Sequence, residues 1–123
     1  MTSPAQRIDR LSRCLAVLEE ATRRYQEEGG NHLPSRITLD MVGILLHVAA
    51  NPLQSVTDIG KSMGQPSSTT SRQLLDLGLK DRNLRDGFGL VEPVADPIDM
   101  RIKRYRLTEK GRGVVDKMLE ELK

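Results

Sequence analysis

The segment DPIDMRIKRYRLTEKGR, which spans residues 96–112, decides the fold. It begins with the turn-forming sequence Asp-Pro-Ile-Asp and continues as a basic run. Six of the twelve residues from Arg101 to Arg112 are lysine or arginine, and Glu109 is the one acid among them. Such a concentration of positive charge on a short, strand-like segment predicts a surface that meets an anionic partner.

Residues 90–94 and 102–107 are expected to be two strands, joined by a turn at residues 95–99 in which Pro97 fits well. Side chains alternate between the two faces of a strand, so Arg101, Lys103, Tyr105 and Leu107 share one face and Ile102, Arg104 and Arg106 the other. We expect Tyr105 and Leu107 to pack inward at the base of this hairpin. Arg101 and Lys103 then project near its tip, where Asp99 serves as a structural partner for the arginine.

Before the hairpin, residues 55–63 and about 66–80 predict two helices joined by a tight turn at Gly64. Ser55 is expected to cap the first of them. The second starts with small hydroxyl residues, although serine and threonine are poor helix formers. Two interpretations fit it equally well. It is either the recognition helix of a helix-turn-helix, which enters the DNA major groove, or a capped surface helix with a solvated polar face.

The first helix is expected to start at Ser3, with Pro4 and Gln6 completing its cap, and to stop at residues 29–30, which are both glycine. Its apolar residues recur at heptad spacing and form a narrow seam, which favours pairing with one partner helix. The seam consists of Ile8, Leu11, Leu15, Leu18 and Tyr25, with Thr22 in the remaining slot.

Two further helices are expected. Residues 38–50 are apolar nearly all round and should form the most buried element, with His47 as a core or edge histidine. Thr108 can cap a last helix whose apolar stripe consists of Val114, Val115, Met118, Leu119 and Leu122. Helix, helix, helix-turn-helix, hairpin and helix is the order of a winged-helix domain. The predicted fold class is thus mainly α with a small β-hairpin.

The composition limits what the chain can do. Its 123 residues fit one domain, and the net charge of +2 gives no general affinity for anions. The single cysteine, Cys14, excludes an intramolecular disulfide, is expected to be packed rather than reactive, and leaves no multi-cysteine metal site. No apolar run is long enough to span a bilayer, and the N-terminus is unlike a signal peptide, so we expect a cytoplasmic protein. No set of residues indicates catalysis, a metal or a cofactor, so we do not expect an enzyme.

With the hairpin and its flanks interpreted, the sequence resembles the MarR family of bacterial regulators over about residues 38–122. The residues that carry the resemblance are Asp99-Met100-Arg101 at the hairpin tip and the segment from Arg106 to Arg112 (RLTEKGR) after it. The sequence departs from the family pattern in three ways. The spacing between Leu77 and Leu90 is longer, Met100 stands where a basic residue is usual, and the chain stops one helix short of the usual dimerisation region.

The resemblance implies a transcriptional regulator that binds double-stranded DNA sequence-specifically as a homodimer, with residues 66–80 in the major groove and the hairpin at the minor groove. The domain 1–123 then divides into a dimerisation helix (1–30), a winged helix-turn-helix core (38–108) and a C-terminal helix (109–123). The expected DNA-binding residues are Ser67, Ser68, Thr69, Ser71, Arg72, Gln73, Lys80, Arg82, Arg101, Lys103 and Arg104.

The alternative is a winged-helix module that binds protein, because a fold does not dictate its function. The basic hairpin strand argues against that alternative, since a protein-binding hairpin has less need of its charge. Some relatives bind small aromatic acids between the dimerisation helices and the DNA-binding part. No residue pattern in this sequence supports such an effector.

Overall fold

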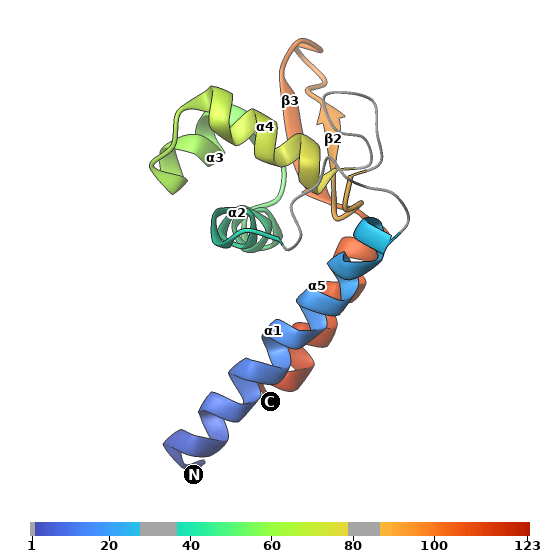
Figure 1. Cartoon of the computed structure of the whole chain (residues 1–123). Helices are drawn as coiled ribbons and strands as arrows, with labels where there is room; N and C mark the ends of the chain where they lie inside the picture. Colours follow the sequence, from blue (N-terminus) through green and yellow to red (C-terminus); the bar gives the residue numbers. More distant parts are fainter. Residues whose placement is uncertain (1, 28–36, 79–86) are drawn as a thin grey trace.

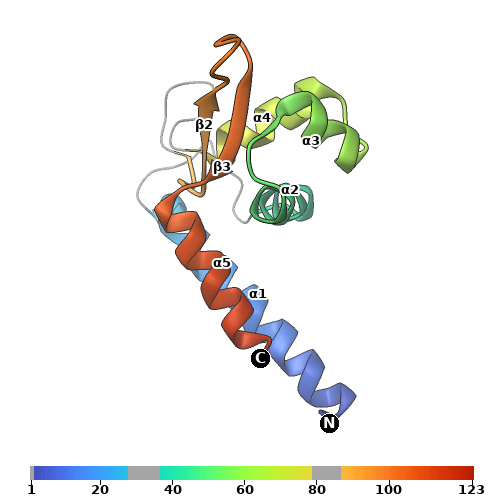
Figure 2. The same ribbon diagram turned by 180° about the vertical axis from the view of Figure 1, so that it is seen from behind.

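The computed structural model describes residues 2–27, 37–78 and 87–123. Helices α2, α3 and α4 and a small sheet form one lobe. Helices α1 and α5 extend together from one side of this lobe and run antiparallel to each other (Figures 1 and 2). We call the α1–α5 pair the stalk. In chain order the elements are α1 (Pro4–Glu27), α2 (Leu39–Ala50), β1 (Gln54–Ser55), α3 (Val56–Met63), α4 (Ser67–Leu77), β2 (Val91–Ala95), β3 (Lys103–Leu107) and α5 (Glu109–Glu121).

The helix starts follow from local capping. The Ser3 N–H donates to Gln6 Oε1 over 2.9 Å and the Gln6 N–H donates to Ser3 Oγ over 3.2 Å, which is the predicted capping box. The Ser55 hydroxyl accepts from the Asp58 N–H, and the Thr108 hydroxyl accepts from the Gly111 N–H. These caps confirm the predicted starts of α1, α3 and α5. The predicted stop of α1 at residues 29–30 lies outside the described residues.

The sheet has the antiparallel order β1-β3-β2, so β3 is its central strand. Tyr105 of β3 lies opposite Gln54 of β1 on one side and Pro93 of β2 on the other. Strands β2 and β3 each begin one residue later than the sequence predicted. Strand β1 was not predicted, because a two-residue strand shows no periodicity. Through β1, the hairpin is fixed to the start of α3.

The core lies where α2, α3, α4 and the hairpin meet. Ile44, Leu45, Ile59, Leu74, Leu77, Phe88, Leu90 and Val91 are all fully buried. Phe88, which lies outside the helices and strands, is also part of this core. Helix α2 also differs from the prediction, because it is not buried all round: Leu39 is 85% exposed and Leu46 is 44% exposed.

In the stalk, α1 packs against α5 of the same chain, and the packed face differs from the predicted seam. Cys14, Leu18 and Thr22 are buried, whereas Ile8, Leu11 and Leu15 are more than half exposed. Within the single chain, α5 therefore covers Leu18 of the predicted seam and leaves these three residues exposed. Burial and the nearby Glu121 carboxylate raise the pKa of the Cys14 thiol, which keeps it protonated and agrees with a packing role. Among the described helices, none is both long and apolar enough to cross a membrane.

Helix α4 ends earlier than predicted, at Leu77 rather than at residue 80. The chain turns at Gly78, which has an extended conformation and whose N–H donates to the Leu75 carbonyl. A little further on, the Phe88 N–H bonds the Asp76 carbonyl and the Leu90 N–H bonds the Leu77 carbonyl. The end of α4 is thus fixed by backbone hydrogen bonds to the segment that leads into β2.

Candidate nucleic-acid interface

The orientation of α4 is set by its buried face. Thr70, Leu74 and Leu77 are fully buried, and the Thr70 hydroxyl contacts Gln65 Oε1 at 3.1 Å and the Pro66 carbonyl at 3.2 Å. With 3.6 residues per turn, Ser68 and Arg72 lie nearly opposite this face, one turn apart. Both are exposed, and within the described part of the chain Arg72 forms no ion pair. They present a hydroxyl and a free guanidinium to solvent.

The other predicted contacts on α4 are less accessible. Ser67 at the start of the helix is exposed, whereas Thr69, Ser71 and Gln73 are half-buried. Gln73 leans toward the buried side, and its Oε1 is buried without a hydrogen-bond partner among the described residues. Lys80 and Arg82 lie outside the described residues. The helix therefore places Ser68 and Arg72 together on its outer face, with Thr69 and Ser71 at the sides and Ser67 exposed at its N-terminal end.

The hairpin of β2 and β3 with its turn, residues 91–107, is the wing. It projects from the lobe at the end opposite the stalk, beside α4 (Figure 1). As predicted, Tyr105 is buried, Leu107 packs against the core, and Asp99 binds Arg101 through two hydrogen bonds of 3.0 Å. The side chain of Arg101 is nevertheless 90% exposed.

Most of the positive charge on the wing is matched by acids on the wing itself. Arg101 pairs with Asp99, Arg104 with Asp96 at 2.7 Å, and Arg106 with Glu92 at 3.2 Å. Lys103 is exposed and forms no ion pair with any described residue. The sequence predicted the pairing of Arg101 with Asp99 but not those of Arg104 and Arg106. Among the described residues, the wing keeps Lys103 as its one unpaired cation, beside the exposed guanidinium of Arg101.

Asp96 is a structural residue that the sequence analysis treated only as part of a turn. It is buried, and its carboxylate accepts the N–H groups of Ile98 and Asp99 at 2.8 and 2.9 Å. It also accepts from Nε of Arg104, whose Nη1 donates to the Leu53 carbonyl. The Asp99 N–H, the Arg104 guanidinium and the Ile98 N–H hold the pKa of Asp96 down at about 2. Arg104 thus ties the wing turn to the residue before β1.

We expect Asp96→Asn to lower the melting temperature at neutral pH, because the substitution removes the charge that binds Arg104. The depressed pKa means that this stabilisation is complete above the ordinary value of 3.8 and disappears as the pH falls through about 2. The melting temperatures of the wild type and the variant, followed by circular dichroism, should therefore converge between these values. Asp99→Asn is the matched control, since the Asp99 carboxylate accepts only from the backbone N–H and the exposed side chain of Arg101, two residues further along the same turn. Equal melting temperatures at pH 7 would contradict this role.

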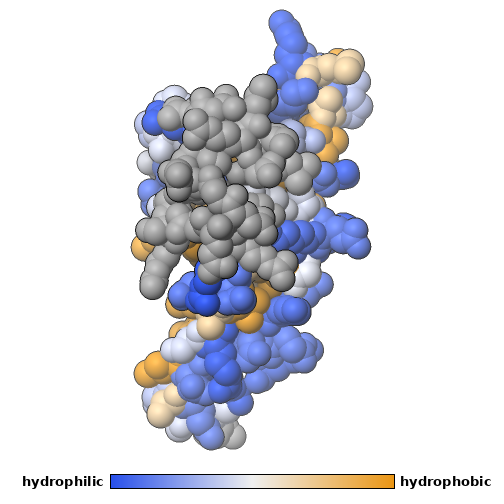
Figure 3. Space-filling model, turned by 45° about the vertical axis from the view of Figure 1, so that its right-hand side comes forward, coloured by the Kyte–Doolittle hydropathy of each residue, from blue (hydrophilic) through white to orange (hydrophobic). Residues whose placement is uncertain are grey.

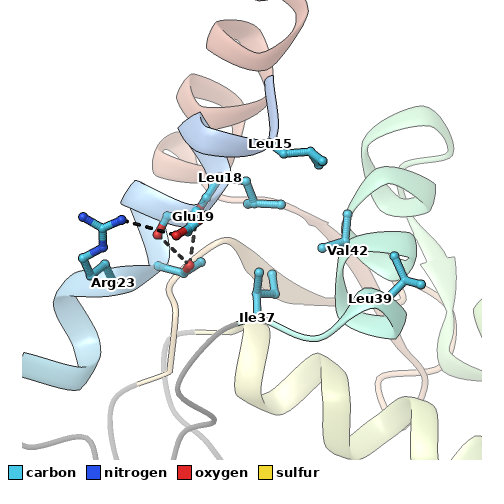
Figure 4. Close-up of a pocket in the computed structure, with 8 residues that line it drawn as sticks. Leu15, Leu18, Glu19, Arg23, Ile37, Leu39 and Val42 are labelled. Atoms are coloured by element: carbon cyan, nitrogen blue, oxygen red, sulfur yellow. Dashed lines mark hydrogen bonds and ion pairs between the residues drawn. The ribbon is translucent and has the colours of Figure 1, made fainter. Parts of the chain in front are cut away.

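A pocket of about 490 Å³ lies between α1 and the start of α2. Leu15, Leu18, Ile37, Leu39 and Val42 point into it, and Glu19 pairs with Arg23 at its edge (Figure 4). This pocket was not predicted, because its walls come from segments that are not adjacent in the chain. It is an apolar cavity between the stalk and the lobe.

The stalk carries a second exposed apolar feature, the stalk stripe. In Figure 3 the lower part of the molecule shows hydrophobic surface along one edge and hydrophilic side chains along the other. The stripe comprises Ile8, Leu11 and Leu15 of α1, which are 63%, 54% and 56% exposed, together with Leu119 and Leu122, which are 55% and 40% exposed. Large apolar side chains left exposed on two paired helices are candidates for an interaction surface.

Several solved structures are similar in fold to this chain. A MarR family transcription regulator, SP03579, matches with a TM-score of 0.56 and 23% identity over 86% of this chain and 58% of its own. Streptococcus pneumoniae FabT, whose structure is a complex with DNA, matches with a TM-score of 0.57 and 19% identity over 89% of this chain and 68% of its own. The regulator Tm0710 of Thermotoga maritima matches with a TM-score of 0.59 and 22% identity over 98% and 74%.

The chain has the MarR-like winged-helix fold, as the sequence resemblance implied. It spans 58% of the length of the first of these regulators, SP03579. No protein-family model and no curated protein sequence matches the chain. At 19–23% identity, these structural matches establish the fold of the chain but not its function.

Proposed function

We propose that the chain is a non-enzymatic, cytoplasmic regulator of transcription that binds double-stranded DNA sequence-specifically. In this proposal α4 enters the major groove and the wing lies along the adjacent minor groove. The observation that carries the proposal is the pair of exposed residues Ser68 and Arg72, which stand free on the outer face of α4 beside the wing.

The chemistry of these side chains suits the two grooves. The guanidinium of Arg72 can bind O6 and N7 of a guanine together, the commonest specific contact in the major groove. The hydroxyls of Ser67 and Ser68 can bind bases or phosphates at short range. Lys103 is suited to a phosphate, and Arg101 to the negative potential of a narrow minor groove. All five of these side chains are exposed to solvent.

A homodimer fits the exposed stalk stripe. The two-fold interface of a homodimer uses the same patch on both subunits, and the stripe offers such a patch at the end of the molecule away from α4. Two copies of α4 could then reach successive major grooves, about 34 Å apart. The dimer would also double the number of cations that meet phosphates, which matters for a chain of net charge +2.

One observation favours the alternative, a module that binds protein. Three of the four wing cations already have acidic partners, so the wing offers less free charge than its sequence suggests. In vitro selection of bound duplexes from a random library separates the two functions. The proposal expects recovery of a palindromic motif and an affinity that falls steeply with salt. A protein that retained no duplex at low salt would leave the protein-binding alternative.

Arg72→Ala is expected to relax base preference at one position of each half-site, at a cost of about 1–3 kcal/mol there. Lys103→Ala is the matched control: it should weaken binding to all sequences alike and reduce the salt dependence. Arg104 is a poorer control, because its guanidinium also holds the wing turn. The measurement is fluorescence anisotropy on the selected site and its single-base variants. Uniform weakening by Arg72→Ala would make Arg72 a phosphate contact and refute its assigned role.

A further inference from the structure

The wing tip carries two large apolar side chains that are mostly exposed to solvent. Ile98 is 96% exposed and Met100 is 73% exposed, which ranks both among the most exposed large apolar residues of the described structure. Figure 3 shows hydrophobic and strongly hydrophilic surface next to each other at the top of the molecule, where the wing ends. The sequence had marked Met100 only as a departure, because it replaces a basic residue of the family pattern.

The tip is built as a fixed turn. The Ile102 N–H donates to the Asp99 carbonyl over 3.0 Å, which places Met100 and Arg101 at the two central positions of a four-residue turn. Below it, the Asp96 N–H donates to the Ile102 carbonyl, and the Asp96 carboxylate accepts from the N–H of Ile98. Both apolar side chains therefore project from a backbone that hydrogen bonds have already ordered.

Two cations flank this apolar tip. Arg101 follows Met100 directly and is held by Asp99, with most of its guanidinium in solvent, and Lys103 stands two residues further along. A tip that combines bulky apolar groups with cations at its sides is complementary to the DNA minor groove. In that groove the cations can bind the phosphates and the region of negative potential at its base. The apolar groups can pack against sugars and base edges.

We infer that Met100 and Ile98 form an apolar wedge that enters the minor groove and partly unstacks a base step, so that the wing bends the DNA. The inference rests on the proposed function and adds to it a second way of reading sequence. Pyrimidine–purine steps such as TpA are the easiest to unstack. The wedge should therefore favour such a step at a fixed distance from the bases that α4 contacts, without any hydrogen bond to it.

The test uses the full chain and duplexes of about 30 base pairs, which hold two half-sites about 10 base pairs apart, taken from the selection described above. The adenine of each flanking TpA step is replaced by 2-aminopurine, whose fluorescence rises when it is unstacked. Donor and acceptor dyes on the duplex ends report the bend. All signals are read at saturating protein, so that differences in affinity do not enter them.

The polar variant Ile98→Thr with Met100→Gln keeps side chains of similar size at both positions and makes them polar. The apolar control is Ile98→Val with Met100→Leu. All four changes are at highly exposed positions, so the melting temperatures should stay within about 2 °C of the wild type. A fall beyond that in the polar variant alone would show that these residues serve the fold, and it would overturn the inference.

The wedge predicts that wild type and apolar control raise the 2-aminopurine signal and bend the duplex by about 20–90°. The polar variant should lose most of both effects. If the wild type binds the duplex without unstacking it, or if the polar variant unstacks it equally well, the wedge is refuted and the proposed function stands. If the wild type binds no duplex, the proposed function fails first, and the wedge with it.

Discussion

Gly111→Ala is expected to destabilise the protein by about 3 kcal/mol or more, which corresponds to a fall in melting temperature of roughly 10 °C or more. A Cβ atom on Gly111 would lie 2.0 Å from the Leu90 carbonyl oxygen and 3.0 Å from its carbon. That oxygen already accepts the N–H of Thr108 over 3.0 Å, so the backbone cannot move away without breaking the junction of the wing and α5. Urea unfolding followed by circular dichroism measures the effect.

Gly113 provides the matched control in the same helix. A Cβ atom there would meet nothing within 4 Å, and the residue is exposed. Gly113→Ala should therefore stabilise the protein by about 0.5–1 kcal/mol, because alanine has the higher helix propensity. If both variants shifted stability in the same direction, the close approach at Gly111 would not be what requires glycine.

The second large effect concerns the proposed dimer. Leu11→Glu combined with Leu15→Glu should give a folded monomer, because the two side chains are 54% and 56% exposed in the single chain. Charges in the stalk stripe would oppose its burial against a second copy. Loss of one half-site should weaken binding to a palindromic duplex by about 10²–10⁴-fold. Sedimentation equilibrium measures the assembly state, and anisotropy measures the affinity.

Two substitutions elsewhere on α1 separate a general effect of charge from an effect on the stripe. Ala5→Glu with Ala16→Glu adds the same two charges at exposed positions on another side of the helix. This control should remain a dimer with unchanged affinity for DNA. A wild-type chain that sediments as a monomer at tens of micromolar would contradict the proposed dimer directly.

The features that the sequence predicted well depend on neighbours a few residues apart. The capping of α1, α3 and α5 by Ser3, Ser55 and Thr108 is decided within one turn, so the residue types suffice to predict it. Gly64 is similar: its left-handed φ of 66° is a conformation that glycine adopts at little cost, and it ends α3 as expected. The order of these signals was enough to indicate the winged helix.

The features that the sequence missed depend on contacts between distant residues. Strand β1 exists because Gln54 lies opposite Tyr105 in the register, and Phe88 is buried because backbone bonds draw its segment onto the end of α4. Along α1 the apolar spacing showed that a stripe exists. It could not show how much of that stripe α5 would cover: α5 covers Leu18 together with the neighbouring Cys14, and Ile8, Leu11 and Leu15 stay exposed.

The sequence predicted which residues of the candidate site are exposed, but it did not predict how most of the charged residues of the wing pair with one another. Exposure of Ser68 and Arg72 follows from helical periodicity once Thr70 and Leu74 are placed inside. The pairing of Arg104 with Asp96 could not be predicted, because it joins residues eight positions apart across a turn. Counting charges along the sequence therefore overestimated the free positive charge of the wing.

The pairing of α1 with α5 has a consequence for how the chain is made. A nascent chain leaves the ribosome N-terminus first, so α1 emerges long before its packing partner. Until α5 has been translated, the face of α1 that holds Cys14, Val17 and Leu18 has no helix to cover it. Strand β1 must likewise wait for β3, which is the slow, long-range kind of contact. During synthesis the chain thus exposes apolar surface that only translation of α5 removes, and it should engage chaperones most strongly in that interval.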